Sequence, residues 1–167
     1  MRRLVSPTIL VAVLSLSTFP TPAHTQDRSP ELQRLGFLAG AWSFEMDRGA
    51  AGTETCQWLG EQFVQCHDVF ETSPEVTQEM LGVWGYDADR AVYVWDRYWS
   101  QGRVDHSVGW ITGNTWTFLL QIEGSPRRLA RLTMTEDSPT TYSFKWESCI
   151  EGQDWVPSSA GTATRVQ

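Results

Sequence analysis

The chain has 167 residues, with 20 acidic side chains against 13 basic ones and a formal net charge of -7, which is enough for one acidic domain. This charge excludes nucleic acid as a partner, because binding to phosphates requires a basic surface. Hydrophobic residues make up 41% of the sequence and charged residues 20%, so the chain has material for a core and is not a disordered polyelectrolyte.

The first 23 residues have the pattern of a secretory signal peptide. Arg2 and Arg3 form a basic start, residues 4–18 are an uncharged apolar run, and small residues lead to a cleavage site after Ala23. The apolar run is shorter than the roughly 20 residues that a bilayer span needs. We therefore expect a secreted or periplasmic protein that does not span the membrane, with residues 24–30 as a polar lead-in.

Residues 31–167 are predicted to form a single antiparallel meander. Short segments of alternating polar and apolar residues are separated by clusters of Gly, Asp, Asn, Ser or Pro about every ten residues. Only residues 29–38 have helical spacing, and Pro30 suits a first helical turn after Ser29. We expect strands at 41–47, 53–59, 62–70, 76–86, 91–99, 103–111, 115–122, 128–136, 140–149 and 159–166.

Pairing consecutive strands through their turns assigns each side chain to a face of the sheet. Most large apolar residues share one face: Trp42, Phe44, Met46, Val92, Val94, Tyr98, Val104, Val108, Trp110, Trp116, Phe118, Leu120, Ala130, Leu132, Met134, Tyr142, Phe144 and Trp146. A sheet of about ten strands with one apolar face must stack on itself or close, and closure also removes the exposed edges. We therefore expect an all-β, up-and-down antiparallel barrel.

Two short motifs at opposite ends of this meander resemble those of calycin barrels, the superfamily of lipocalins, fatty-acid-binding proteins and nitrobindins. The first strand begins with Gly40-Ala41-Trp42, and Arg165 occupies the place on the last strand from which an arginine packs across that tryptophan. The resemblance implies that Gly40, Trp42 and Arg165 are fold residues. Together with Gly85-Tyr86-Asp87 and a final hairpin near Trp155, the pattern looks most like bacterial exported lipocalin-like domains of unknown function.

The histidines and the remaining motifs give no support for a cofactor. Nitrobindin-like barrels hold haem iron through a histidine near the carboxyl end, and no histidine follows His106 in this sequence. A glycine-rich loop preceding a helix is also missing, so nucleotide binding has no support. We expect no cofactor.

Cys56 and Cys66 flank the turn at Gly60-Glu61 and are predicted to form a disulfide, which an exported protein permits. A three-residue loop, 60–62, places them directly opposite each other, whereas a two-residue turn throws them onto opposite faces. The alternative is two separate buried thiols. Cys149 is then unpaired, and its spacing from other ligands gives no metal motif, so we expect no metal site.

One acid/base cluster can be built from the expected strand pairing. With the turn at 100–102, Asp96 lies opposite His106, and both share the apolar face with Tyr98. Arg97 lies opposite Asp105 on the outer face. The stronger interpretation is a buried pair in which Asp96 and His106 satisfy each other's hydrogen bonds. The alternative is a cluster that orients a ligand.

The tryptophans indicate a narrow interior. Most of them are expected to point inward, so side chains fill much of the barrel and leave a reduced cavity lined by aromatic groups such as Trp84 and Trp110. Tyr93, Trp95 and Trp99 are expected on the outer face. There they would form an apolar patch for a partner or a dimer, unless long arginine side chains cover them.

Three functions remain open. The favoured hypothesis is a binding module for a small apolar or aromatic molecule, with Asp96, Tyr98, His106, Trp110 and Trp84 as candidate ligand-binding residues. The second is a filled barrel that engages another protein through Tyr93, Trp95 and Trp99. The third is a lyase or isomerase with His106 as base and Asp96 as its orienting group.

Overall fold

A computed structural model describes residues 28–47, 49–73, 76–122 and 126–166. The expected signal peptide and most of the polar lead-in, residues 1–27, lie outside the described residues. Within the described residues, no helix has the length and apolar character that crossing a bilayer requires.

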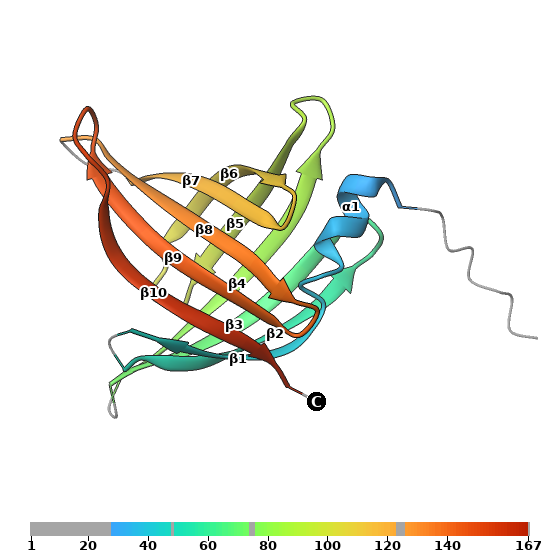
Figure 1. Cartoon of the computed structure of the whole chain (residues 1–167), viewed down its shortest axis with the longest axis horizontal. Helices are drawn as coiled ribbons and strands as arrows, with labels where there is room; N and C mark the ends of the chain where they lie inside the picture. The colour runs from blue at the N-terminus through green and yellow to red at the C-terminus, as the bar shows by residue number, and fades with distance from the viewer. Residues whose placement is uncertain (1–27, 48, 74–75, 123–125, 167) are drawn as a thin grey trace, which may run out of the picture.

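Ten antiparallel strands close into a barrel, and one short helix, α1 (Pro30–Leu35), lies at one end (Figure 1). Each strand pairs with its neighbours in sequence, and the first strand pairs with the last, so the expected up-and-down barrel is confirmed. The strands are β1 (Gly40–Met46), β2 (Ala51–Leu59), β3 (Phe63–Ser73), β4 (Val76–Asp87), β5 (Val92–Trp99), β6 (Val104–Thr112), β7 (Thr115–Ile122), β8 (Arg128–Ser138), β9 (Thr141–Ile150) and β10 (Val156–Arg165).

Helix α1 begins at the expected place and closes one end of the barrel. The Ser29 side chain accepts a hydrogen bond from the backbone N–H of Leu32, and Pro30 occupies the first turn, where no N–H donor is needed. Leu35 and Leu38 are fully buried. The helix ends three residues earlier than predicted, because the chain turns at Gly36 to enter β1.

Arg165 fastens the last strand to the first. Its guanidinium carbon lies 4.2 Å from the centre of the Trp42 ring, and its nitrogens donate to the carbonyl oxygens of Phe37 and Ala39. Trp42 in turn donates from Nε1 to the Leu38 carbonyl oxygen at 2.8 Å. A Cβ atom at Gly40 would stand 2.2 Å from Arg165 Nη1, so the Gly-x-Trp spacing leaves room for this arginine.

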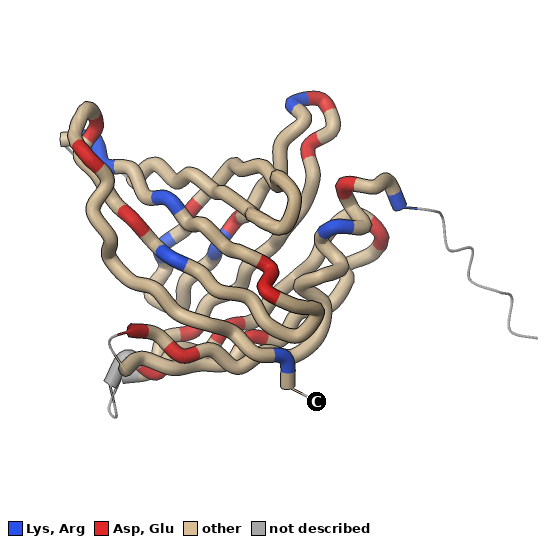
Figure 2. Tube along the Cα trace, viewed as in Figure 1, with Lys and Arg blue, Asp and Glu red and all other residues tan. Residues whose placement is uncertain are grey.

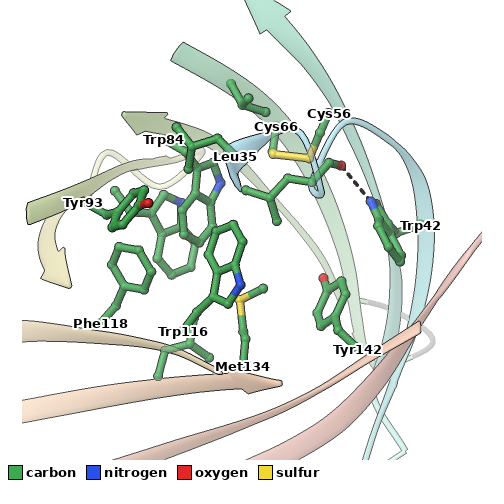
Figure 3. Packing of buried hydrophobic residues seen from close by; sticks show 14 of the residues in the cluster. Leu35, Trp42, Cys56, Cys66, Trp84, Tyr93, Trp116, Phe118, Met134 and Tyr142 are labelled. Carbon is green, nitrogen blue, oxygen red and sulfur yellow. Dashed lines mark hydrogen bonds between the residues drawn. A yellow bond between two sulfur atoms is a disulfide. The ribbon is translucent and has the colours of Figure 1, made fainter. Parts of the chain in front are cut away.

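The Cys56–Cys66 disulfide is present, and its expected geometry is confirmed. Leu59 pairs with Phe63, which leaves the three-residue loop 60–62 and sets Cys56 directly opposite Cys66. Both cysteines are buried in the cluster that also holds Trp42, Trp84 and Tyr142 (Figure 3). The bond is consistent with an oxidising extracellular or periplasmic compartment.

The predicted faces of β5 and β6 are wrong. We expected a three-residue turn at 112–114, but Thr112 pairs with Thr115, which leaves a two-residue turn with Gly113 at φ +61° in its first central position. A change of one residue moves every side chain of a strand to the other face. The residues that the structure places outward instead of inward are Val92, Val94, Asp96, Tyr98, Val104, His106, Val108 and Trp110.

Four glycines of the sheet lie directly across from a phenylalanine whose ring covers them. The pairs are Phe44 with Gly52, Phe63 with Gly85, Phe118 with Gly109, and Phe144 with Gly161. In each pair, a Cβ atom on the glycine would stand within 3 Å of the phenylalanine ring. The ring therefore covers the glycine, a device that lets a curved sheet keep a packed surface where a strand bends.

Two glycine substitutions should separate backbone crowding from side-chain crowding. A Cβ at Gly109 would meet the Thr117 carbonyl oxygen at 2.2 Å as well as the Phe118 ring, whereas at Gly85 it would meet only side chains, chiefly the half-exposed Phe63. We expect Gly109→Ala to lower the free energy of unfolding by about 3 kcal/mol and Gly85→Ala by about 1 kcal/mol, because Phe63 can rotate away. Urea unfolding measures both, and equal losses would contradict the argument.

Candidate functional site

The interior holds a cavity of about 290 Å³ in the half of the barrel away from α1. Its wall is mainly aromatic and apolar, and four polar or charged side chains interrupt it at depth: Glu54, Asp68, Arg97 and Tyr142. The apolar and aromatic lining residues are Leu38, Phe44, Met46, Phe70, Met80, Trp84, Trp95, Trp99, Leu132, Met134, Tyr142, Phe144 and Trp146.

The cavity has a closed floor and an open mouth. Leu38, which follows α1, belongs to the floor and is fully buried. Lining residues near the strand ends farthest from α1 are only half-buried: Met46, Phe70, Gln78, Trp99 and Ser159. A molecule would therefore enter between those strand ends and stop above the helix.

A pair of carboxyl groups lies buried in this wall. Glu54 on β2 and Asp68 on β3 are directly opposite each other and are exposed by only 7% and 4%. The two carboxyls hydrogen-bond to each other, which requires a proton on one of them. The Tyr142 hydroxyl donates a second hydrogen bond to Glu54 Oε1 at 3.3 Å.

This pair holds its proton to an unusually high pH. Burial raises the pKa of Glu54 to about 7, although hydrogen bonds from Asp68 and Tyr142 lower it in part. Burial and then the charge of Glu54 raise the pKa of Asp68 well above its usual range. Strands β1, β2 and β3 carry no lysine or arginine of their own, as the red but not blue segments along them in Figure 2 show. The neighbouring cation comes instead from β5.

That cation is Arg97, which is 4% exposed and enclosed by tryptophans. Its guanidinium carbon lies 4.4 Å from the Trp95 ring centre and 4.9 Å from that of Trp146. Burial lowers the pKa of Arg97 to about 10, against the opposing effect of Asp105, so the side chain stays protonated at neutral pH. Arg97 Nη2 lies 3.2 Å from Asp105 Oδ2.

Asp105 itself is shared among several donors. Trp99 Nε1 donates to Asp105 Oδ2 at 2.8 Å, and Arg103 Nη2 lies 3.3 Å from the same oxygen. Arg97 is not aligned for a hydrogen bond with it, and Arg97 Nε and Nη2 have no hydrogen-bond partner among the described residues. The carboxylate of Asp105 therefore does not satisfy the buried guanidinium.

The structure places four of the five predicted ligand-binding residues outside the cavity. Asp96 and His106 are opposite each other and hydrogen-bonded, as expected, but both side chains point to solvent. Tyr98 and Trp110 are also outside, with 46% and 48% of their surface exposed. Only Trp84 lines the cavity.

The predicted outer patch is likewise wrong, because the same change of face turns its members inward. Tyr93 and Trp95 are buried, and Trp99 lines the mouth of the cavity. Trp95 stacks on Trp84 with ring centres 4.1 Å apart. Arg97, which we expected on the outer face opposite Asp105, is opposite Asp105 but inside.

Sequence reasoning missed Glu54 and Asp68, although the sequence contained the signal. A loop of three residues that sets Cys56 opposite Cys66 also sets Glu54 opposite Asp68, two residues farther along each strand and on the same face. In this sequence, an inward-facing Cys56–Cys66 disulfide therefore predicts that Glu54 and Asp68 also face inward.

Comparison with known proteins establishes the fold alone. No family model and no curated protein matches this sequence. Among solved structures, the barrel is similar to the crystal structure of Rv2717c from M. tuberculosis, with a TM-score of 0.62 and 15% sequence identity over 84% of this chain and the whole of that one.

The carboxyl pair should make stability depend on pH. Unfolded Glu54 releases its proton near pH 4.5 and folded Glu54 near pH 7, so the folded state binds more protons between these values and loses stability as the pH rises. The loss from Glu54 is about 3 kcal/mol, or roughly 10 °C in melting temperature. Thermal melts from pH 5 to 8 should show this slope in the wild type and a much smaller one in the double variant Glu54→Gln, Asp68→Asn. Equal slopes would show that other groups cause the dependence.

Proposed function

We propose that the protein is an exported binding module that takes up a small aromatic or apolar molecule in the barrel cavity. The observation that carries the proposal is the cavity itself: the interior side chains leave about 290 Å³ behind an aromatic wall, with a mouth at one end. This volume is at the lower end of the range of ligand pockets, roughly 300–1,000 Å³.

The shape of the wall favours a planar ligand. Trp95, Trp146 and Phe144 line the same cavity, and flat rings pack against such faces with more contact than a flexible chain achieves. A long fatty acid would lose rotational freedom on entry and would not fit in the available space. The resemblance to calycin barrels, which bind small apolar molecules, agrees with this function but remains a likeness of fold.

Export belongs to the same proposal. The predicted signal peptide would direct the chain out of the cytoplasm, and the Cys56–Cys66 disulfide is consistent with an oxidising compartment. The position of Asp96 and His106 on the outer surface gives no support to the lyase or isomerase hypothesis. Likewise, the inward orientation of Tyr93 and Trp95 removes the surface on which the interaction hypothesis rested.

A panel of small aromatic molecules with one or two rings tests the proposal through quenching of tryptophan fluorescence and thermal melts. At a concentration of about 100 times Kd, a ligand should stabilise the protein by about 2.7 kcal/mol. Hexadecanoate, tested beside the panel, should produce no shift. If no member of the panel shifts the melting temperature, the proposed function is wrong.

A matched pair of variants assigns the binding to the cavity. Ser159 lines the mouth, whereas its neighbour Ser158 is exposed. Ser159→Phe should weaken binding at least tenfold by filling the mouth, and Ser158→Phe should leave it unchanged. Equal affinities in the two variants would place the bound molecule elsewhere.

A further inference from the structure

Among the described residues, the cavity wall contains more unpartnered buried hydrogen-bond donors than unpartnered buried acceptors. Trp84 Nε1, Trp95 Nε1, and Nε and Nη2 of Arg97 are buried donors without a partner among the described residues. In the part of the chain that the structure describes, Asp68 Oδ1 is the only buried acceptor of the cavity wall without a partner. Buried polar groups without partners cost stability, so an incoming molecule that supplies acceptor atoms would be favoured.

The donors also converge in space. Gly82 lies opposite Arg97 on β4, and a Cβ atom there would stand 2.8 Å from Trp95 Nε1 and 3.6 Å from Trp84 Nε1. The absence of a side chain at Gly82 therefore keeps both indole N–H groups beside the arginine. Such a group of donors around a buried cation fits a carboxylate or a similar oxyanion.

The charges of the interior set a condition on that anion. Asp105 offsets the charge of Arg97 only in part, because it also pairs with Arg103, whose side chain is 61% exposed to solvent. A Glu54–Asp68 pair that holds one proton carries one negative charge and balances the remaining positive charge of Arg97. An anion that entered would leave one uncompensated negative charge in a buried site, unless the pair took up a second proton.

We propose that the cavity binds a small aromatic anion, such as an aromatic carboxylate, at Arg97, and that the Glu54–Asp68 pair takes up one proton as the anion enters. This inference rests on the proposed function and names its ligand class. The proton comes from solvent and is released again when the anion leaves, so no bond other than O–H forms or breaks.

The groups that face the carboxyl pair are few among the described residues. Tyr142 on β9 and Arg97 on β5 are the titratable ones, with Asp105 on β6 behind Arg97. Cys56 and Cys66 are bonded and do not titrate. The cavity-lining residues from the remaining strands carry no ionisable group: Phe44, Met46, Gln78, Met80, Trp84, Leu132, Met134 and Ser159. A cationic ligand in this cavity would be repelled by Arg97, which lies between Trp95 and Trp146.

Three probes of matched shape test the inference: 2-naphthoate, 2-naphthamide and 2-naphthylmethylamine, which are anionic, neutral and cationic. At pH 6 we expect naphthoate to bind at least tenfold more tightly than the amide and the amine to bind most weakly. Above pH 7 the Kd of naphthoate should rise about tenfold per pH unit, because one proton accompanies binding, while the Kd of the amide stays constant. Calorimetry in two buffers of different ionisation enthalpy should show uptake of up to one proton with naphthoate and none with the amide.

Two variants separate the roles of the arginine and the carboxyl pair. Arg97→Gln should abolish the preference for naphthoate over the amide, and a thermal melt in the same buffer shows that the variant is folded. Glu54→Gln with Asp68→Asn should bind naphthoate with the same Kd from pH 6 to 9 and without proton uptake.

The outcomes distinguish this inference from the proposed function. If the amide binds as tightly as naphthoate to the wild type and neither Kd varies with pH, the inference of an anionic ligand with proton uptake is wrong. The proposed binding of aromatic molecules in the cavity would be unaffected. Tightest binding of the amine, strengthening as the pH rises, would overturn the inference in favour of a cation. Failure of all three probes, together with the panel of small aromatic molecules, would overturn the proposed function as well.

Discussion

The stack of Arg165 on Trp42 joins two strands that are neighbours in the barrel but lie at opposite ends of the chain. The other strand pairs are linked by a turn, so their pairing carries a small cost in loop entropy, whereas β1 and β10 must be brought together across the whole domain. Arg165 also donates to the backbone that leads out of α1. This side chain therefore reinforces the pairing of β1 with β10 and holds the segment after α1, which includes Leu38 at the floor of the cavity.

The architecture could be predicted because its signals are local. Alternation and turn residues gave ten strands, and the Gly-x-Trp motif with a distant arginine gave the closed end. The disulfide was also predictable, because only a loop with an odd number of residues sets Cys56 directly opposite Cys66. For the strands and the disulfide, a few neighbouring residues determine the outcome, whereas the pairing of Arg165 with Trp42 followed from the resemblance to calycin barrels.

The candidate site could not be predicted in the same way, because it depends on the parity of successive turns. The turn before Thr115 was predicted one residue too long, which assigned every side chain of β5 and β6 to the wrong face. Asp96 was therefore expected in the interior, where the structure has Arg97. Composition offered no warning, since Tyr93, Trp95 and Trp99 alternate with Val94 and Tyr98, and both faces of β5 look apolar. The pairing of Thr112 with Thr115 and the packing of Trp95 on Trp84 distinguish the two registers.

The pairing of phenylalanines with glycines has a consequence for the size of the cavity. Phe44 and Phe144 both line the cavity, and behind each ring stands a glycine of the adjoining strand. Shortening either ring would extend the cavity to bare peptide backbone, because no Cβ atom stands in the way. Single substitutions of this kind would enlarge the cavity and leave Arg97, the carboxyl pair and the strand register in place. The size of the proposed ligand and the proposed recognition of its charge therefore depend on separate residues.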